Sequence, residues 1–148
     1  MTQPAIQPQQ EQPQIEPVFV ARQPIFDRAE RLWGYELLFR HSAEATSAAF
    51  SESSVATSKM VADGFILAQA GLPPACMLFI NFPEALLLEG AAYALPKEQC
   101  VVEILEDVPP TSAILTACGK LKEACYVLAL DDYFGETAME PFLALADI

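Results

Sequence analysis

Apolar segments alternate along the chain with segments whose hydrophobic residues recur at helical spacing. The first two apolar segments, 18–26 and 31–39, flank the charged residues 27–30 and predict two strands joined by a short turn that faces solvent. Segment 51–71 predicts an amphipathic helix, because serines precede it, Gly71 follows it, and its apolar residues fall on one broad helical face. That predicted face consists of Ala56, Met60, Val61, Gly64, Phe65, Leu67 and Ala68.

Three later segments are apolar runs without alternation, as expected of strands covered on both faces: 76–82, 100–106 and 126–132. Helices are predicted between them at 83–90, with Pro83 at the first helical position, and at 111–125, with Thr111 or Ser112 as N-cap. Strands joined by helices over short links are most simply parallel, so we expect an α/β protein.

Each of these strands brings a polar residue close to its carboxyl end. The set consists of Glu36 and Arg40, then Asn81, then Glu103, and finally the adjacent pair Asp131 and Asp132. Strand ends of this kind converge on the ligand site in α/β sheets and barrels. Carboxylate and amide oxygens without His or Cys suit Mg²⁺, Mn²⁺ or Ca²⁺. The alternative is that Asp131 and Asp132 cap the next helix or face solvent in a loop, and that Glu36 and Arg40 are ordinary surface residues.

Composition narrows the function classes. The 148 residues are 53% hydrophobic, enough for one domain with a sizeable core. A net charge of -12 argues against nucleic acid and anionic membranes as partners. Apolar runs stay well short of the ~20 residues that span a bilayer, and the N-terminus lacks a secretory signal, so we expect a soluble cytoplasmic protein. The four cysteines have no CxxC spacing and predict buried free thiols.

The first segment of the chain differs from the rest. Residues 1–17 are rich in Gln and Pro and almost without large apolar side chains, so burial cannot offset the entropy cost of ordering them. We expect a disordered leader over 1–17, followed by a domain over 18–148.

Four motifs, in this order, resemble those of EAL domains, the cyclic di-GMP phosphodiesterase family. ARQPIFDRAERLWGYELLFR is similar to the family's opening, in which a QPI segment and a turn precede G-x-E-A-L-x-R. FINF resembles the strand with the family's metal-binding Asn, VVEILED its E-[IL]-T-E strand, and LALDDYFG its DDFGTG motif. The match extends from Val18 to the end of the chain, and looks most like the divergent EAL domains that precede an HDOD domain.

The resemblance implies a fold, a metal site and a reaction. The fold would be a TIM-type (β/α) barrel, with residues 18–148 as its N-terminal half. One or two Mg²⁺ or Mn²⁺ ions would be bound by Glu36, Asn81, Glu103, Asp131 and Asp132. Gln23 and Arg40 would face the cyclic dinucleotide, and in the family's reaction a metal-bound water attacks one phosphodiester.

The chain also departs from the family pattern. Leu37 replaces the Ala of the first motif, Leu105 replaces the Thr of the third, and an extra aromatic residue separates the two acids from Gly135. The chain ends where the family continues with the strand that carries its essential Lys. We therefore expect a fragment of a longer signalling protein, a partial EAL-like domain incomplete at its C-terminus. Alone, it should fold poorly or associate, and should not hydrolyse cyclic di-GMP.

Two functions follow from this comparison. We favour a non-catalytic regulatory or binding module in cyclic di-GMP signalling, which acts with a protein partner, an attached C-terminal domain or a second copy of itself. The alternative is a metal-dependent cyclic di-GMP phosphodiesterase when the full barrel is present. An unrelated metal-dependent α/β hydrolase is a third interpretation, should the match be chance.

Overall fold

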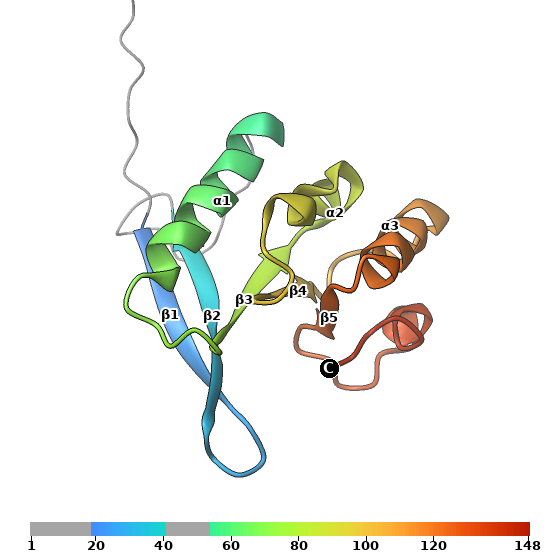
Figure 1. The fold of residues 1–148 in the computed structure, drawn as a ribbon. Helices are drawn as coiled ribbons and strands as arrows, with labels where there is room; N and C mark the ends of the chain where they lie inside the picture. Colours follow the sequence, from blue (N-terminus) through green and yellow to red (C-terminus); the bar gives the residue numbers. More distant parts are fainter. Residues whose placement is uncertain (1–18, 41–53) are drawn as a thin grey trace, which may run out of the picture.

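The computed structural model describes residues 19–40 and 54–148, which form a five-stranded sheet (Figure 1). Its strands are β1 (Phe19–Phe26), β2 (Leu32–Arg40), β3 (Met77–Phe82), β4 (Cys100–Ile104) and β5 (Val127–Leu130). They lie across the sheet in chain order; β1 and β2 are antiparallel, and each later pair is parallel. The predicted α/β fold is therefore confirmed, and the expected leader at 1–17 lies outside the described residues.

Helices cover one face of this sheet (Figure 1). They are α1 (Ser54–Gln69), α2 (Glu84–Glu89) and α3 (Ser112–Glu123). Two 3-10 helices, η1 (Ala91–Ala94) and η2 (Thr137–Phe142), were not predicted from the sequence. The main hydrophobic core lies between the helices and the sheet, where Ile80, Ile104 and Leu128 are buried.

Local sequence signals explain where two of the helices begin and end. Thr111 rather than Ser112 caps α3, because its Oγ1 accepts a hydrogen bond from the Ile114 N–H at 3.3 Å. Pro83 lies one position before the predicted one, at the N-cap of α2. Gly90 ends α2 in the left-handed conformation, with φ 69°, which glycine adopts without strain.

The buried face of α1 is narrower than the sequence predicts. Val61, Phe65 and Ala68 are buried as expected, but the side chain of Leu67 is 64% exposed. Leu67 follows Phe65 by two positions, about 200° around the helix, and so points away from the sheet. The side chains of Ala56 and Met60 lie outside the described residues.

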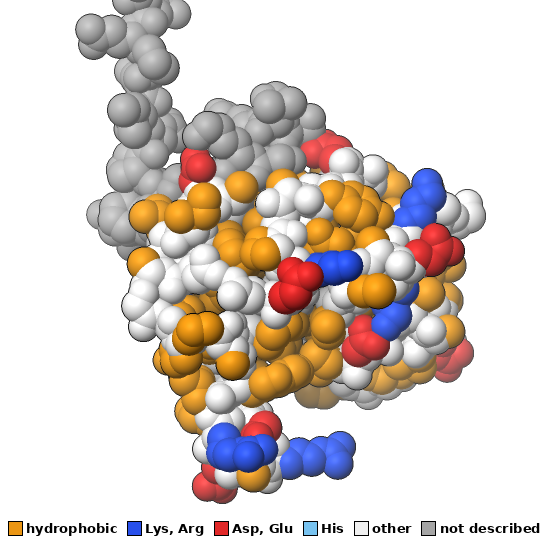
Figure 2. Space-filling view, viewed as in Figure 1, with side chains coloured by type: hydrophobic (Ala, Val, Ile, Leu, Met, Phe, Trp, Pro, Cys, Tyr) orange, Lys and Arg blue, Asp and Glu red, His pale blue; other side chains and the backbone are white. Residues whose placement is uncertain are grey.

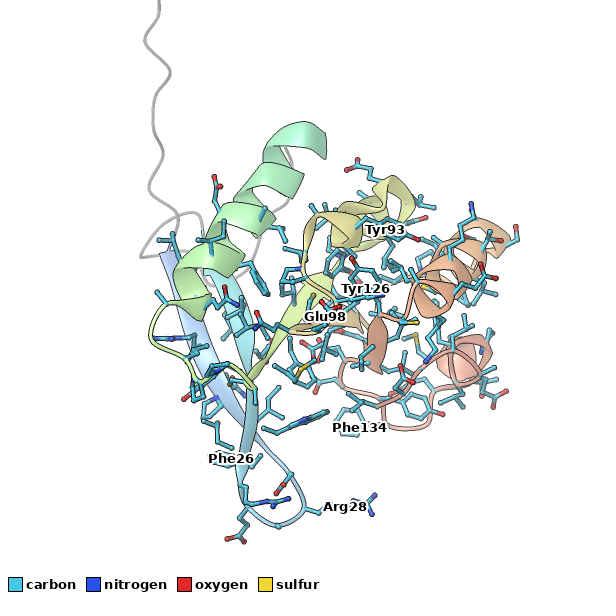
Figure 3. All side chains as sticks on the ribbon, in the orientation of Figure 1. Phe26, Arg28, Tyr93, Glu98, Tyr126 and Phe134 are labelled. Atoms are coloured by element: carbon cyan, nitrogen blue, oxygen red, sulfur yellow. The ribbon has the colours of Figure 1, made fainter. Side chains whose placement is uncertain are left out.

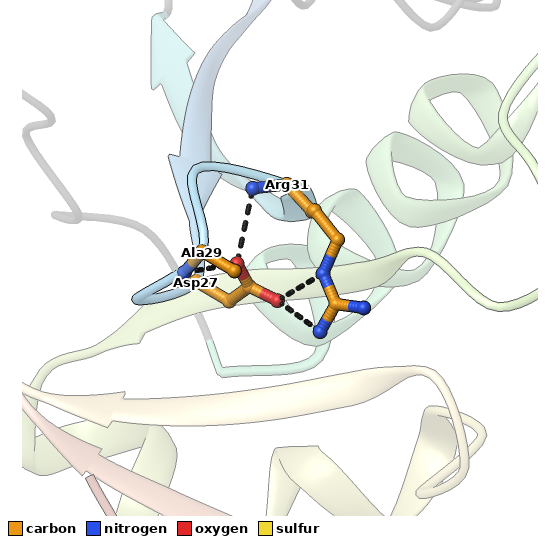
Figure 4. A network of polar contacts seen from close by, with 3 residues as sticks. All are labelled: Asp27, Ala29 and Arg31. Atoms are coloured by element: carbon orange, nitrogen blue, oxygen red, sulfur yellow. Dashed lines mark hydrogen bonds and ion pairs between the residues drawn. The ribbon is translucent and has the colours of Figure 1, made fainter.

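The turn between β1 and β2 is fixed by one carboxylate (Figure 4). Asp27 Oδ1 accepts hydrogen bonds from the backbone N–H groups of Ala29 and Arg31, at 2.8 and 3.0 Å. Its Oδ2 accepts a hydrogen bond from Arg31 Nε at 2.9 Å. The backbone bonds shape the turn, whereas the exposed ion pair to Arg31 adds little stability. The charged turn projects from the body of the molecule, as expected (Figure 2).

Several large apolar side chains remain in contact with water, and Figure 2 shows hydrophobic side chains over much of the visible face. They include Phe26, Leu32 and Trp33 in the β1–β2 hairpin and Phe134 after β5. Figure 3 places Phe26 on the hairpin and Phe134 on the loop beyond β5. Such exposure agrees with a sheet that is open rather than closed into a barrel.

The cysteines follow the prediction with one correction. Cys76, Cys100 and Cys118 are free and buried, and burial raises the pKa of Cys100 to about 12. Cys125 is free but exposed, because it lies in the left-handed turn after α3, with φ 67°. Among the described residues, no helix combines the length and the apolar character needed to cross a membrane.

The contrast between two phenylalanines tests this core. Phe142 of η2 is 0% exposed, whereas Phe134 is 84% exposed. We expect F142A to lower the free energy of unfolding by about 3–5 kcal/mol, through lost burial and the cavity left behind. F134A, the matched control, should change it by less than about 0.5 kcal/mol. Urea denaturation measures both; F142L, of intermediate cost, replaces F142A if that variant does not fold. Equal effects of F142A and F134A would contradict the assigned core.

Candidate metal centre

The face of the sheet opposite the helices carries the polar residues predicted at the strand ends. A second apolar cluster, Phe79, Val101 and Ala129, lies on this face. Asn81 and Glu103 each lie two positions beyond a member of that cluster, and side chains two apart in a strand point to the same face. The register places them opposite one another, Asn81 beside Glu103. The cluster therefore forms the floor beneath the polar residues.

Glu36 and Asp131 join the same face from β2 and β5. Glu36 pairs in register with Phe79 of the floor. Asp131 follows Ala129 by two positions, and its N–H donates to the carbonyl of Ile104 at 3.0 Å, so it continues the β4–β5 ladder by one residue. Four neighbouring strands thus bring one oxygen-bearing side chain each to a common face.

A close approach of β2 to β3 lets two of these side chains meet. Asn81 Nδ2 donates a hydrogen bond to Glu36 Oε1 at 3.0 Å. At Gly34, two residues before Glu36, an added Cβ would lie 2.5 Å from the Met77 carbonyl oxygen and 2.9 Å from the Phe79 ring. Gly34 therefore allows the backbone spacing that the Glu36–Asn81 contact requires.

Two oxygens of the site are buried without a hydrogen-bond partner: Asn81 Oδ1 and Glu103 Oε2. The Glu103 residue as a whole is 8% exposed, the one buried charged residue among those described. A buried polar atom without a partner costs free energy, and native structures contain few of them. A hard divalent cation would satisfy both atoms, because carboxylate and amide oxygens are its preferred ligands.

Burial and nearby carboxylates also oppose the ionisation of Glu103 and Asp131. The pKa of Glu103 is raised from its usual 4.5 to about 8, chiefly by burial and then by the charge of Glu36. The charges of Asp131 and Asp132 act in the same direction. Burial is also the first cause that raises the pKa of Asp131, followed by the charge of Asp132. A bound cation would reverse this repulsion, so the donor set and its electrostatics fit a divalent metal.

The structure places the other predicted residues as follows. Asp132 is exposed and adopts a left-handed conformation, with φ 45°, directly after Asp131. Neither of the two caps the next helix, because the N-cap of η2 is Glu136. Gln23 lies opposite Glu36 on β1 and is exposed. Arg40 is the last residue of β2, and its side chain lies outside the described residues.

The predicted ligands are spread over several strand ends. Within residues 19–40 and 54–148, no group of three or more His, Cys, Asp and Glu side chains stands ready to hold a metal. The four predicted carboxylates, Glu36, Glu103, Asp131 and Asp132, therefore do not form such a group by themselves, and the hydrogen bond within the predicted set joins Asn81 Nδ2 to Glu36 Oε1.

Sequence reasoning missed two parts of the site. One is the apolar floor. The spacing of two residues between Phe79 and Asn81, and between Val101 and Glu103, could have revealed that these side chains share one face. Trp33 packs edge-on against Phe79 of this floor, with ring centroids 5.2 Å apart. The other is the structural role of Gly34: the glycine of the G-x-E-A-L-x-R pattern marks this position, but its role depends on the distance between two strands, which a single sequence does not contain.

Comparison with known proteins relates the chain to two curated sequences, whereas no protein-family model matches it. It is 38% identical over 137 residues to the Bacillus subtilis protein YuxH, across 88% of this chain and 33% of that protein. It is 37% identical over 133 residues to the cyclic di-GMP phosphodiesterase CdgJ of Vibrio cholerae, across 88% of this chain and 30% of that protein. The chain thus spans about a third of the length of these relatives.

Solved structures with the same fold are EAL proteins and cyclic di-GMP complexes. An EAL domain protein of Listeria monocytogenes matches with a TM-score of 0.65 at 18% identity, over 88% of this chain and 61% of that one. A manganese and cyclic di-GMP complex of Klebsiella pneumoniae BlrP1 gives 0.58 at 20% identity, over 93% and 40%. Bacillus subtilis YkuI, an EAL-domain protein with cyclic di-GMP and calcium, gives 0.54 at 18% identity, over 86% and 39%.

The raised pKa of Glu103 predicts how stability depends on pH. Without divalent cations, the folded chain keeps the Glu103 proton up to about pH 8, whereas the unfolded chain releases it near 4.5. The stabilisation is complete below about pH 4.5 and is lost as the pH rises through about 8, because the folded state binds the extra proton between these values. We expect the free energy of unfolding to fall over this range, by at most about 1.4 kcal/mol per pH unit for one group.

The variant E103Q should remove the fall in the free energy of unfolding as the pH rises toward about 8, because an amide does not ionise. E89Q, at an exposed glutamate of α2, is the matched control and should keep it. Urea denaturation in a chelating buffer, from about pH 5 to about pH 9, gives the slopes. An unchanged slope in E103Q would show that Glu103 titrates normally.

The fold and the sequence motifs point to the same family. Asn81 of FINF, Glu103 of VVEILED and Asp131 of LALDDYFG, the residues that resemble the family's ligands, lie on one face of the sheet. The described sheet covers part of the barrel of its structural neighbours, as the coverage of 61% or less of each of those chains shows. The chain therefore has the EAL fold, and it resembles the N-terminal part of an EAL domain.

Proposed function

We propose that this chain is the metal-binding part of an EAL-type domain that binds cyclic di-GMP as a signal and does not by itself hydrolyse it. The observation that supports this most is the pair of buried oxygens without partners, Asn81 Oδ1 and Glu103 Oε2. Burial and the charges of neighbouring carboxylates also raise the pKa of Glu103 and of Asp131. An arrangement that is unfavourable when empty becomes favourable once a cation is bound.

The position of each predicted residue indicates its proposed role in metal binding. Glu36, Asn81, Glu103 and Asp131 would hold Mg²⁺ or Mn²⁺, and the exposed Asp132 would add negative charge at the rim. The bound cation would supply positive charge for a phosphate group. That charge matters because a chain of net charge -12 would otherwise repel an anionic dinucleotide.

Two further residues would contact the dinucleotide. Gln23 lies opposite Glu36 on the neighbouring strand, and opposite residues of an antiparallel pair point to the same face. Arg40, at the end of β2, would bind a phosphate through its guanidinium. Two of the solved structural neighbours contain cyclic di-GMP with manganese or calcium, which supports this choice of ligand.

The loop after β5 favours binding over hydrolysis. Asp132 turns into the left-handed region, and both it and the following Tyr133 and Phe134 are exposed. Leu105, at the position of the family's Thr, is partly buried against the main core. The side chains around a second cation would therefore differ from the family pattern.

The alternative function is metal-dependent cyclic di-GMP hydrolysis by a longer protein that contains the whole barrel. The relative CdgJ, named as a cyclic di-GMP phosphodiesterase, favours this alternative. An attached HDOD domain, a protein partner, self-association and a cytoplasmic location stay predictions.

Metal binding is tested first, by titrating the chain with Mn²⁺ at about pH 7.5 and following its melting temperature. We expect a rise of several degrees, since a ligand at about 100 times its Kd stabilises the folded state by about 2.7 kcal/mol. E103Q should lose at least about tenfold in Mn²⁺ affinity, because it replaces a ligand. E89Q should bind like the wild type. No shift in the wild type would overturn the metal site.

Cyclic di-GMP is then titrated calorimetrically with and without Mn²⁺, and the mixture is assayed for the linear dinucleotide. We expect Mn²⁺-dependent binding without turnover. Turnover would replace the proposed function by the phosphodiesterase. If the chain binds Mn²⁺ but neither binds nor hydrolyses cyclic di-GMP, the choice of cyclic di-GMP as the ligand is contradicted.

A further inference from the structure

The last residues of the chain return to the free edge of β5. In the segment between β5 and these last residues, Met139 and Phe142 of η2 are buried in the main core, which anchors η2 beside the sheet. From there the backbone reaches β5, where Asp147 N donates to the Leu128 carbonyl at 2.8 Å. Ile148 N donates to the same carbonyl at 3.3 Å, and Leu130 N donates to the Ile148 carbonyl at 3.2 Å.

The two bonds of Ile148 follow the pattern of a parallel ladder. In such a ladder, one residue bonds through its N–H and its C=O to the residues on either side of its partner. Ile148 bonds in this way to Leu128 and Leu130, so its partner is Ala129. Residues 147–148 thus pair with β5 along its outer edge, although they form no strand of their own.

The carboxylate of Asp147 connects three elements at this point. Its Oδ2 accepts a hydrogen bond from the Leu128 backbone N–H at 3.0 Å. Its Oδ1 is paired with Lys122 Nζ at the end of α3. The Lys122 contact is the main reason that the pKa of Asp147 is lowered, so the carboxylate is charged at neutral pH. One side chain therefore ties the tail to α3 and to β5.

The residues of β5 that the tail holds, Leu128 and Leu130, precede the proposed ligand Asp131 in the chain. Asp131 is held on the β4 side by its N–H bond to Ile104, as described above. On the other side, the residues that precede it, Leu128 and Leu130, are held by residues 147–148. β5 has four residues, so its end is set by these few bonds.

We propose that Asp147 is a positioning residue for the metal site: by accepting the Leu128 N–H and holding residues 147–148 against β5, it fixes the place of Asp131. This inference rests on the proposed metal binding. Asp147 is not one of the proposed metal ligands, and its effect would pass through the backbone of β5.

Three variants of the 148-residue chain separate the two side-chain contacts of Asp147, with Leu128 N–H and with Lys122. D147A removes both contacts and should weaken Mn²⁺ binding about tenfold, the lower end of what loss of a supporting residue costs a metal site. D147N keeps a carbonyl oxygen that can accept from Leu128 N–H and should restore affinity to within about threefold of wild type. K122M removes only the ion pair and should behave like D147N. D147S, whose hydroxyl is too short to reach both partners, replaces D147A if that variant does not fold.

Calorimetry gives the Mn²⁺ affinity, and amide hydrogen exchange at Leu128 and Leu130 reports the contact itself. Exchange at both amides should be faster in D147A than in D147N. Equal Mn²⁺ affinity in D147A and the wild type would overturn the positioning role, as would D147N binding as weakly as D147A. A wild-type chain that binds no Mn²⁺ overturns the proposed function instead, and the exchange rates then still show whether Asp147 holds the edge of β5.

Discussion

Burial of a carboxylate beside other carboxylates, on one face of the sheet, is the constraint on which the site depends. Glu103 is almost fully buried, yet the charges of Glu36, Asp131 and Asp132 all act on it. Its pKa near 8 means that the metal-free site holds a proton at neutral pH. A protonated carboxyl is one solution to this repulsion, and a divalent cation is the other. Protons and metal ions therefore compete for the same oxygens.

The fold produces this repulsion and also limits it. Parallel strands bring their carboxyl ends to the same edge, so residues far apart in sequence meet without a dedicated loop. Gly34 lets β2 lie close enough to β3 for Asn81 to donate to Glu36, which satisfies one carboxylate oxygen inside the site. The apolar floor of Phe79, Val101 and Ala129 removes water from below and raises the cost of each charge above it. The main core on the other face supplies the stability that such a site requires.

The sequence predicted those features that depend on short-range patterns. The apolar runs gave β3, β4 and β5, and the polar residues at their ends gave the site, because a strand fixes where its own residues point. Features that depend on distances between elements were not predictable: the spacing at Gly34, and the contact of Asp147 with Leu128 and Lys122. Leu67 and Cys125 were misplaced for a related reason. A helical period defines a face only approximately, and the left-handed turn at Cys125 follows from how α3 joins β5.

The claim that Glu103 belongs to a divalent-cation site is tested most directly by the pKa of its own carboxyl. Carbon-13 NMR of the selectively labelled chain gives this value with and without Mg²⁺, a diamagnetic ion that leaves the signal visible. We predict titration near pH 8 in the metal-free chain and a pKa shifted far downwards when Mg²⁺ is bound. A carboxyl that titrates near its usual 4.5 in both states would contradict the account.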